Sequence, residues 1–225
     1  MRWLRPPARA AAAPPAYLRT QSASDVARHC QLLETRPGPG EVRFVVTPAR
    51  AGWHLDVAAR DRPGLLAMVT GVLSTHDIGV VQAVVATWKD GAALEAFLVD
   101  SVGRDIAALQ AALEGALDRP LTADPVPDAV VVFDNEAGPW FTRMEVLAPD
   151  RIGLLHSVAT AIAVGGADVH GAGVTTRDGV AVDQFDLTNQ GGDKLTAERQ
   201  AAIRQRILSG VHASPRRSRF RNLFV

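Results

Sequence analysis

The chain has 225 residues, of which 47% are hydrophobic and 21% charged, the proportions of an ordinary globular protein. Its 24 basic and 24 acidic residues cancel, so no net charge draws it to nucleic acid or to a membrane surface. A single cysteine, Cys30, excludes an intrachain disulfide framework, and no apolar run reaches the roughly 18 residues of a membrane-spanning helix, so we expect a cytoplasmic protein.

The N-terminal region, residues 1–50, is expected to be an extension with a short helix and a strand. Residues 1–16 are rich in alanine and proline, which favours a flexible segment, and the prolines argue against a signal peptide. Ser22 is placed to cap a helix that ends near Leu33. Residues 41–47 alternate enough to form a strand.

One short phrase then occurs twice. Asp61-Arg62-Pro63-Gly64-Leu65-Leu66 returns 89 residues later (150 − 61) as Asp150-Arg151-Ile152-Gly153-Leu154-Leu155. Each copy follows an apolar strand-like run and opens an apolar helix-like run, and each is followed by an extended segment that ends in Asp-Gly. Repetition at a fixed offset indicates two copies of one structural unit. We call these two phrases the first elbow and the second elbow.

The pattern around each elbow predicts the same series of elements. In the first copy we expect strands over 53–59, 79–87, 92–99 and 130–133 and helices over 64–75 and 104–117. In the second copy we expect strands over 141–147, 168–176 and 180–188 and helices over 153–164 and 196–208, with 220–225 as the only candidate for a closing strand.

The resulting order βαββαβ predicts an α+β protein made of two ferredoxin-like units, each an antiparallel sheet with both helices on one face. We assign residues 51–135 to the first domain, 136–212 to the second and 213–225 to a basic tail. A unit of roughly 75 residues has little core of its own, and its bare edge strand invites pairing. We therefore expect the two copies to pair with each other or within a homodimer.

Each elbow has the chemistry of a binding loop for a zwitterion. Glycine permits close backbone approach, and the free N–H groups at a helix start favour a carboxylate. Asp61 and Asp150 can accept hydrogen bonds from an ammonium group. Across the domain interface, the starts of the following strands would complete each pocket. The predicted ligand-binding residues are therefore Asp61, Arg62, Pro63, Gly64, Leu65, Leu66, Ile78, Val80, Asp150, Arg151, Ile152, Gly153, Leu154, Leu155, Asp168 and His170.

At these residues the chain resembles ACT domains, small regulatory modules that bind amino acids at the strand-to-helix loop. The wider sequence, with Val132-Phe133-Asp134-Asn135-Glu136-Ala137 between the copies, is similar to the C-terminal tandem ACT region of bifunctional PII uridylyltransferase/uridylyl-removing enzymes. The likeness covers about residues 15–210. It implies glutamine as the ligand, a role in nitrogen regulation, and PII or a nitrogen-regulatory enzyme as a partner. Ile152 departs from the proline of the first copy.

The catalytic segments of those enzymes have no counterpart in the sequence. No Gly-rich loop with paired acidic residues marks a nucleotidyltransferase, and His76-Asp77 is interpreted as a polar helix end and not as a metal site. We expect no catalytic residue, no metal and no cofactor, and we predict a regulatory chain. Two alternatives remain open: a divergent or truncated uridylyltransferase/uridylyl-removing enzyme, and an interaction module with empty loops.

Overall fold

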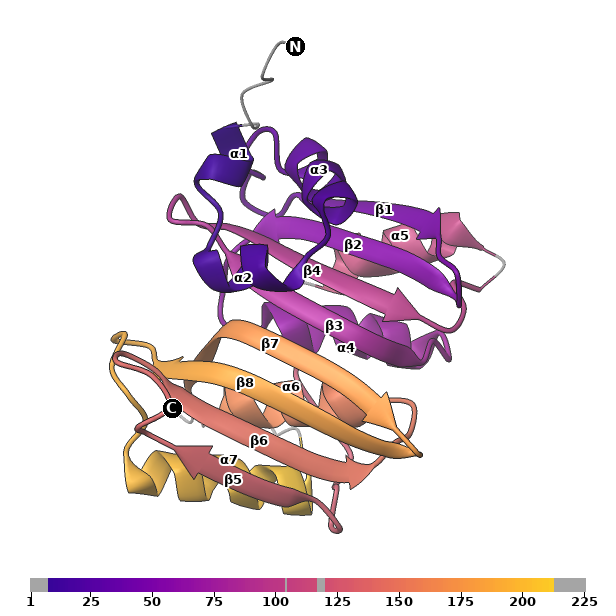
Figure 1. The fold of residues 1–225 in the computed structure, drawn as a ribbon. Coiled ribbons are helices and arrows are strands. Elements are labelled where there is room, and N and C mark those ends of the chain that lie inside the picture. Colours follow the sequence, from indigo (N-terminus) through magenta and orange to yellow (C-terminus); the bar gives the residue numbers. More distant parts are fainter. Residues whose placement is uncertain (1–7, 104, 117–119, 213–225) are drawn as a thin grey trace, which may run out of the picture.

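One antiparallel sheet of eight strands runs through the protein, in the order β1-β2-β4-β3-β7-β8-β6-β5 (Figure 1). The computed structural model describes residues 8–103, 105–116 and 120–212. The strands are β1 (Val42–Pro48), β2 (Trp53–Arg60), β3 (Val80–Thr87), β4 (Ala92–Val99), β5 (Val130–Asp134), β6 (Thr142–Pro149), β7 (Ala167–Arg177) and β8 (Val180–Asn189). The helices are α1 (Ala8–Ala11), α2 (Pro15–Thr20), α3 (Ala23–Leu32), α4 (Leu65–Thr75), α5 (Ile106–Gly115), α6 (Leu154–Val164) and α7 (Ala197–Ser209).

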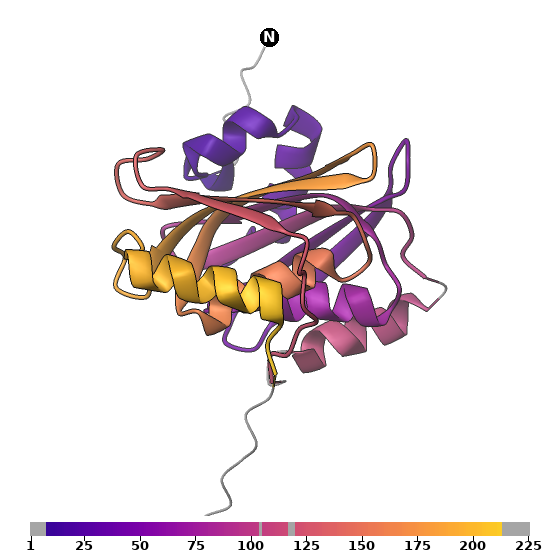
Figure 2. The same cartoon turned by 90° about the horizontal axis from the view of Figure 1, so that it is seen from below.

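The sheet lies between two helical layers (Figure 2). Helices α4, α5, α6 and α7 cover one face, and α1, α2 and α3 cover the opposite face of the first four strands. The apolar side chains under α4 to α7 form one core that extends across both halves of the sheet. The predicted α+β class, with antiparallel ferredoxin-like sheets and paired helices on one face, is confirmed.

The strand at residues 130–133 was assigned to the end of the first copy, and this assignment is wrong. Strand β5 pairs with β6, Val130 opposite Leu147, and so forms the outer edge of the second copy's strands. Strand β1 occupies the same place beside β2. Each half of the molecule, β1 to α5 and β5 to α7, therefore has the chain order ββαββα, because the strand expected to close each unit precedes it.

The two halves pair with each other through their inner edge strands. Strands β3 and β7 run antiparallel, with Val84 opposite Gly173 and Ala86 opposite Gly171. Beneath this seam, α4 packs against α6. The prediction that the copies supply each other's missing neighbour is confirmed, and the seam brings each elbow close to the opposite half.

Helix boundaries follow local capping signals where the sequence contains them. Ser22 accepts the Asp25 N–H at the start of α3, and Thr196 accepts the Arg199 N–H at the start of α7. Ile203 and Ile207 are buried as predicted. In α5 the expected apolar face is only partly buried, because Ile106 is 39% exposed. Residues 104 and 117 of that predicted helix, the candidate strand 220–225 and the basic tail 213–225 lie outside the described residues.

Contrary to the flexible segment predicted for residues 1–16, the described part of this segment is helical and packed. Proline is favoured in the first turn of a helix because its missing N–H has no partner there, and Pro15 occupies that turn in α2. Ala13 and Tyr17 are buried in a second apolar cluster with Trp88 and Leu94, on the sheet face away from α4. The Trp88 indole N–H donates to the Arg9 carbonyl at 3.0 Å.

A buried polar network fixes these N-terminal helices to the sheet. Asp56 of β2 is 1% exposed and accepts from Arg28, and the Nε2 atom of His29 lies 3.1 Å from the same carboxylate. Burial opposes ionisation of Asp56, but hydrogen bonds from His29 and Arg28 outweigh it and lower its pKa. The Tyr17 hydroxyl lies 2.8 Å from His29 Nδ1, and burial raises the pKa of that hydroxyl.

Removing the Tyr17 hydroxyl tests this network. Tyr17→Phe is expected to lower the free energy of unfolding by roughly 1 kcal/mol, because a buried histidine nitrogen loses its partner. Urea unfolding measures the change. Trp140→Phe is the control, since Trp140 is 51% exposed and its replacement is expected to alter stability by less than about 0.5 kcal/mol. Equal stability of the two variants would contradict the network's role.

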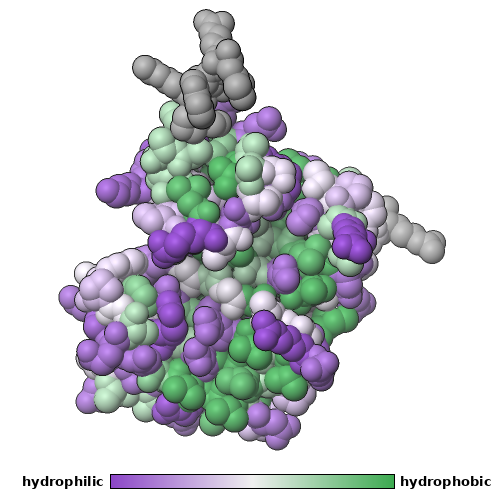
Figure 3. Space-filling model, in the orientation of Figure 1, coloured by the Kyte–Doolittle hydropathy of each residue, from purple (hydrophilic) through white to green (hydrophobic). Residues whose placement is uncertain are grey.

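The corresponding outer face of the second half carries an apolar patch. Figure 3 shows it in green on the lower part of the molecule, where no helix of the described chain covers the strands. Val130, Val132, Leu147 and Val180 are between 37% and 58% exposed there. The two halves thus share a fold but differ in what covers their outer faces.

Candidate functional site

Both elbows are built by a glycine in a left-handed conformation. Gly64 has φ +80° and caps α4, and Gly153 has φ +82° and caps α6. Residues with a Cβ rarely adopt this conformation, so glycine lets the chain turn from strand to helix within a few residues. The two repeated phrases therefore have the same backbone geometry.

Each elbow contacts the far end of the other half's helix. A Cβ on Gly153 would lie 2.8 Å from Ser74 Oγ at the end of α4, and a Cβ on Gly64 would lie 3.5 Å from the Ala163 Cβ near the end of α6. Ser74 and Ala163 are equivalent, since 163 − 74 = 89 is the repeat offset. The same cross-contact therefore occurs twice.

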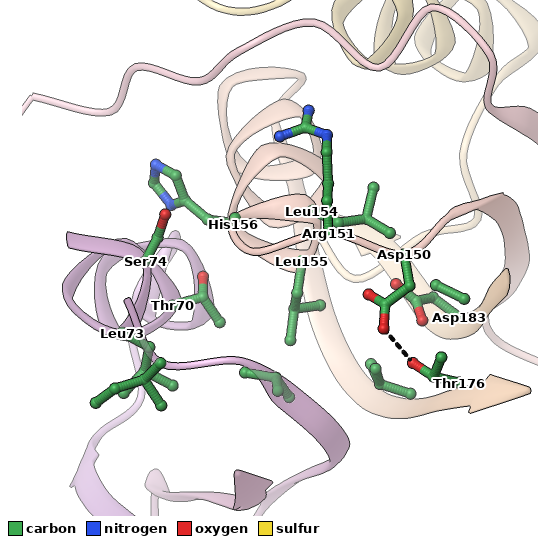
Figure 4. Close-up of a pocket in the computed structure, with 15 residues that line it drawn as sticks. Thr70, Leu73, Ser74, Asp150, Arg151, Leu154, Leu155, His156, Thr176 and Asp183 are labelled. Carbon is green, nitrogen blue, oxygen red and sulfur yellow. Dashed lines mark hydrogen bonds between the residues drawn. The ribbon is translucent and has the colours of Figure 1, made fainter. Parts of the chain in front are cut away.

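The second elbow encloses a cavity with the first half (Figure 4). Its volume is about 20 Å³, room for about one water molecule. The lining comes from α4, the start of β3, the elbow, α6, β7 and β8: Thr70, Leu73, Ser74, Ile78, Val80, Asp150, Arg151, Gly153, Leu154, Leu155, His156, Val174, Thr176, Ala181 and Asp183. The structure thus brings together the predicted residues Ile78 and Val80 with most of the second elbow.

Two carboxyl groups, those of Asp150 and Asp183, belong to the polar lining of this cavity. Asp150 accepts from the Thr176 hydroxyl at 2.9 Å. Asp183 is 1% exposed, and burial together with the charge of Asp150 raises its pKa to about 7. Arg151 points away from both acids in Figure 4 and donates to the Pro125 carbonyl at 3.0 Å. Ile152 is 46% exposed and does not line the cavity.

The first elbow faces a more polar partner surface. Partial burial raises the pKa of Asp61, the charge of Asp168 adds to this effect, and His170 opposes it. The predicted neighbours Asp168 and His170 therefore do lie near Asp61. His170 Nε2 lies 2.8 Å from the Thr188 hydroxyl. Leu121, from the segment between α5 and β5, lies over Gly64, because a Cβ at Gly64 would lie 3.1 Å from the Leu121 side chain.

The remaining residues of the first elbow divide between surface and core. Arg62 and Pro63 are exposed, and Arg62 lines a shallow hollow with Asp61 and Pro39–Glu41. Leu65 and Leu66 are buried in the main core, as are Leu154 and Leu155 of the second elbow. These four leucines anchor the helix starts.

The backbone amides of the elbows are only partly free. The N–H groups of Leu65 and Leu154 donate to the Arg62 and Arg151 carbonyls. Leu154, predicted together with Gly153 to hold a carboxylate, thus has its donor in use within the loop. Among the described residues, the N–H groups of Gly153 and Leu155 have no backbone acceptor. An anion at the start of α6 would meet these two donors.

Several cavity residues were not predicted from the sequence, chiefly Ser74, Thr176 and Asp183. Glu95, the counterpart of Asp183 in the first half, was not predicted either. A usable signal existed for the two acids. Each stands two residues before a phenylalanine, Phe97 or Phe185, whose repeat spacing is apparent, and Glu95 is the only polar residue of the stretch Ala92–Val99. In the described ranges, no group of three or more His, Cys, Asp or Glu side chains is placed to hold a metal ion. No helix there is long and apolar enough to span a membrane.

Comparison with known proteins finds no family model that matches the chain. It is 30% identical over 217 residues to the "Bifunctional uridylyltransferase/uridylyl-removing enzyme" of Gluconobacter oxydans, covering 84% of this chain and 23% of that protein. It is 35% identical over 188 residues to the enzyme of the same description from Novosphingobium aromaticivorans, covering 73% and 20%. The chain thus spans about a fifth to a quarter of the length of these relatives.

Among solved structures, an aspartate kinase from Synechocystis matches 68% of this chain and 26% of its own, with a TM-score of 0.40 and 18% identity. This likeness carries no argument about the site. The description of the chain therefore rests on three other findings: its sequence similarity to the uridylyltransferase/uridylyl-removing enzymes, the duplicated elbow and the strand order of the sheet.

Proposed function

We propose that this chain, a tandem ACT-domain protein that resembles the regulatory region of the bifunctional uridylyltransferase/uridylyl-removing enzymes, is an amino-acid sensor. Its ligand is a small amino acid, glutamine first, bound at the elbows. The resemblance to those enzymes supports glutamine and a role in nitrogen regulation. The sensing role is that of a regulatory region, and it requires no catalytic residue within the chain.

The observation that carries the proposal is the cavity at the second elbow. Gly153 and Leu155 present N–H groups at the start of α6, which suits a carboxylate. Asp150 offers carboxylate oxygens to an ammonium group beside them. Ile78 and Val80, from the other half, supply apolar contact for a side chain. At the first elbow, Asp61 would take the place of Asp150, and the polar residues Asp168 and His170 would take the place of the apolar wall.

The size of the cavity implies that binding is coupled to movement. About 20 Å³ accommodates one water-sized group, such as an ammonium, but not a whole amino acid. The second elbow must therefore move relative to Ser74 and the start of β3 as the ligand enters. A ligand that binds better to the open arrangement shifts the population toward it, by no more than its differential affinity for the two arrangements.

Calorimetric titration of the full chain against the twenty amino acids tests this proposal. We expect heat of binding and a rise in melting temperature with glutamine, and weaker or no effects with amino acids of other side-chain size. Ligand binding to the folded state alone raises stability by mass action. No heat and no thermal shift with any of the twenty would refute the sensing function.

The expected partner is PII or another nitrogen-regulatory protein, whose association would change when the amino acid binds. A second candidate function is the transfer of UMP itself, because the relatives are enzymes. We expect no transfer by this chain, since it spans only about a quarter of such an enzyme. Incubation with PII, UTP and Mg²⁺ separates the two readings: UMP transfer by the purified chain would favour the catalytic one.

A further inference from the structure

On the sheet face covered by α4 to α7, each half of the molecule buries one acidic side chain. Glu95 of β4 is 2% exposed and Asp183 of β8 is 1% exposed. The two are equivalent by strand pairing: Glu95 lies opposite Val57 of β2, and Asp183 lies opposite Val146 of β6. Val57 and Val146 differ by the repeat offset of 89. The buried acid is therefore a duplicated feature, as the elbow is.

Both acids lack a protein partner for one oxygen. Glu95 Oε2 and Asp183 Oδ1 have no hydrogen-bond partner in the described part of the chain, and neither residue forms an ion pair there. Leaving a buried polar atom unpartnered destabilises the fold. An apolar residue at either position would make the fold more stable, so packing alone does not explain why these residues are acidic.

Each buried acid stands behind the aspartate of its own elbow. Asp183 and Asp150 line the same cavity, and the charge of Asp150 acts on Asp183. In the first half the charge of Asp61 acts on Glu95. The other charged or titratable residues that line the second cavity are Arg151, which points away from both acids, and His156. The groups whose charges act on Asp61 from the second half are His170 and Asp168.

We propose that Asp183 is a ligand-recognition residue that forms with Asp150, across the cavity they both line, a two-carboxyl receptor for a primary ammonium group, and that Glu95, at the equivalent strand position with an unpartnered oxygen, serves the first half in the same way. The inference rests on the proposed amino-acid binding and deepens it, since it assigns the group that enters the cavity first. An ammonium group has three N–H donors and the volume of a water molecule, which suits a cavity of about 20 Å³. Two carboxyl groups can accept hydrogen bonds from more of the ammonium N–H donors than one aspartate can, so fewer donors remain unpaired.

The receptor also predicts proton release. Two neighbouring carboxyls share a proton when no cation is present. An ammonium group favours the fully ionised pair, so its entry expels that proton to solvent. Binding is therefore expected to tighten from about pH 6 to about pH 9, as Asp183, with a pKa of about 7, and then Glu95, with a pKa of about 8, lose their protons.

The test compares L-glutamine with glutaramate, which has the same carboxylate and side-chain amide but no ammonium group. By calorimetry at pH 7.5, the unaltered chain is expected to prefer glutamine roughly tenfold to hundredfold, the worth of a charge-assisted hydrogen bond. Glu95→Gln plus Asp183→Asn is expected to lose this preference. Asp186→Asn is the matched control, because Asp186 is on β8 but pairs with Arg143 outside the cavity. Circular dichroism verifies that the isosteric variants fold.

The outcomes separate the two proposals. If the unaltered chain binds glutamine but the double variant keeps the full preference over glutaramate, the two-carboxyl receptor is wrong and the sensing function stands. If the unaltered chain binds no amino acid, both are wrong.

Two further measurements bear on the receptor alone. Titration in buffers of different ionisation enthalpy must show proton release, and a thermal shift with ammonium chloride beyond that of tetramethylammonium chloride would identify free ammonium as an additional occupant.

Discussion

Replacing Gly153 by alanine is expected to weaken glutamine binding about tenfold or more, the effect of misplacing one charged hydrogen bond, and to destabilise the fold. Gly153 has φ +82°, and a Cβ there would lie 2.8 Å from Ser74 Oγ. The unfavourable backbone conformation alone costs roughly 1–2 kcal/mol. The strained backbone and the contact with Ser74 change the local conformation of the second elbow, so that the Gly153 and Leu155 amides no longer converge with Asp150 on one ligand.

Two companion variants separate backbone strain from the contact. Gly179→Ala carries a comparable strain, with φ +77°, but a Cβ there meets nothing within 4 Å. It is expected to lose stability and to keep glutamine affinity. Adding Ser74→Ala to Gly153→Ala removes the obstructing hydroxyl and is expected to restore part of the affinity. Calorimetry and urea unfolding measure both quantities. If Gly153→Ala and Gly179→Ala change glutamine affinity and stability by the same amounts, glutamine binding does not depend on the close approach of the second elbow to α4.

Replacing Glu95 by glutamine is expected to stabilise the protein at alkaline pH. Burial, with the charge of Asp61, raises the pKa of Glu95 from its ordinary 4.5 to about 8. The folded state therefore holds a proton that the unfolded state releases between these values. The contribution of this proton to the free energy of unfolding is fully present below about pH 4.5. It falls as pH rises toward 8, by up to about 1.4 kcal/mol per pH unit. The raised pKa of Asp183 lowers the free energy of unfolding in the same way as pH rises to about 7.

Glutamine at position 95 cannot ionise, so the variant avoids this loss. At pH 8.5 we expect Glu95→Gln to exceed the unaltered chain by about 2 kcal/mol or more in free energy of unfolding, while near pH 4.5 the two differ little. Urea unfolding from pH 4.5 to 9 gives both curves. Glu114→Gln is the control, since Glu114 is exposed on α5 and its replacement should leave the pH profile unchanged. Parallel profiles for Glu95→Gln and the unaltered chain would disprove the buried ionisation.

The sequence predicted those parts of the fold that local patterns determine. The repeated Asp-x-x-Gly phrase located both elbows, and the Ser22 and Thr196 caps located the starts of α3 and α7. It failed where tertiary context decides. Residues 130–133 form the predicted strand, but alternation of side chains cannot say which neighbour a strand joins, and β5 pairs with β6.

The candidate site shows the same division. The elbows and the strand starts Ile78 and Val80 were accessible to sequence reasoning because they repeat or follow from the topology. Glu95 and Asp183 were missed, since one polar residue in a strand is usually a solvent-facing position and only the sheet pairing shows that both face the core. Helices α1 and α2 were missed because an Ala/Pro-rich composition does not reveal the burial of Tyr17.

The seam between β3 and β7 has a consequence for the proposed response to an amino acid. A cavity shared by two separate subunits would empty on dilution as the subunits parted. Here a covalent tether holds both walls at a high effective concentration, which is independent of how much protein is present. The response should therefore follow the metabolite level alone and remain constant as the abundance of the protein itself rises and falls.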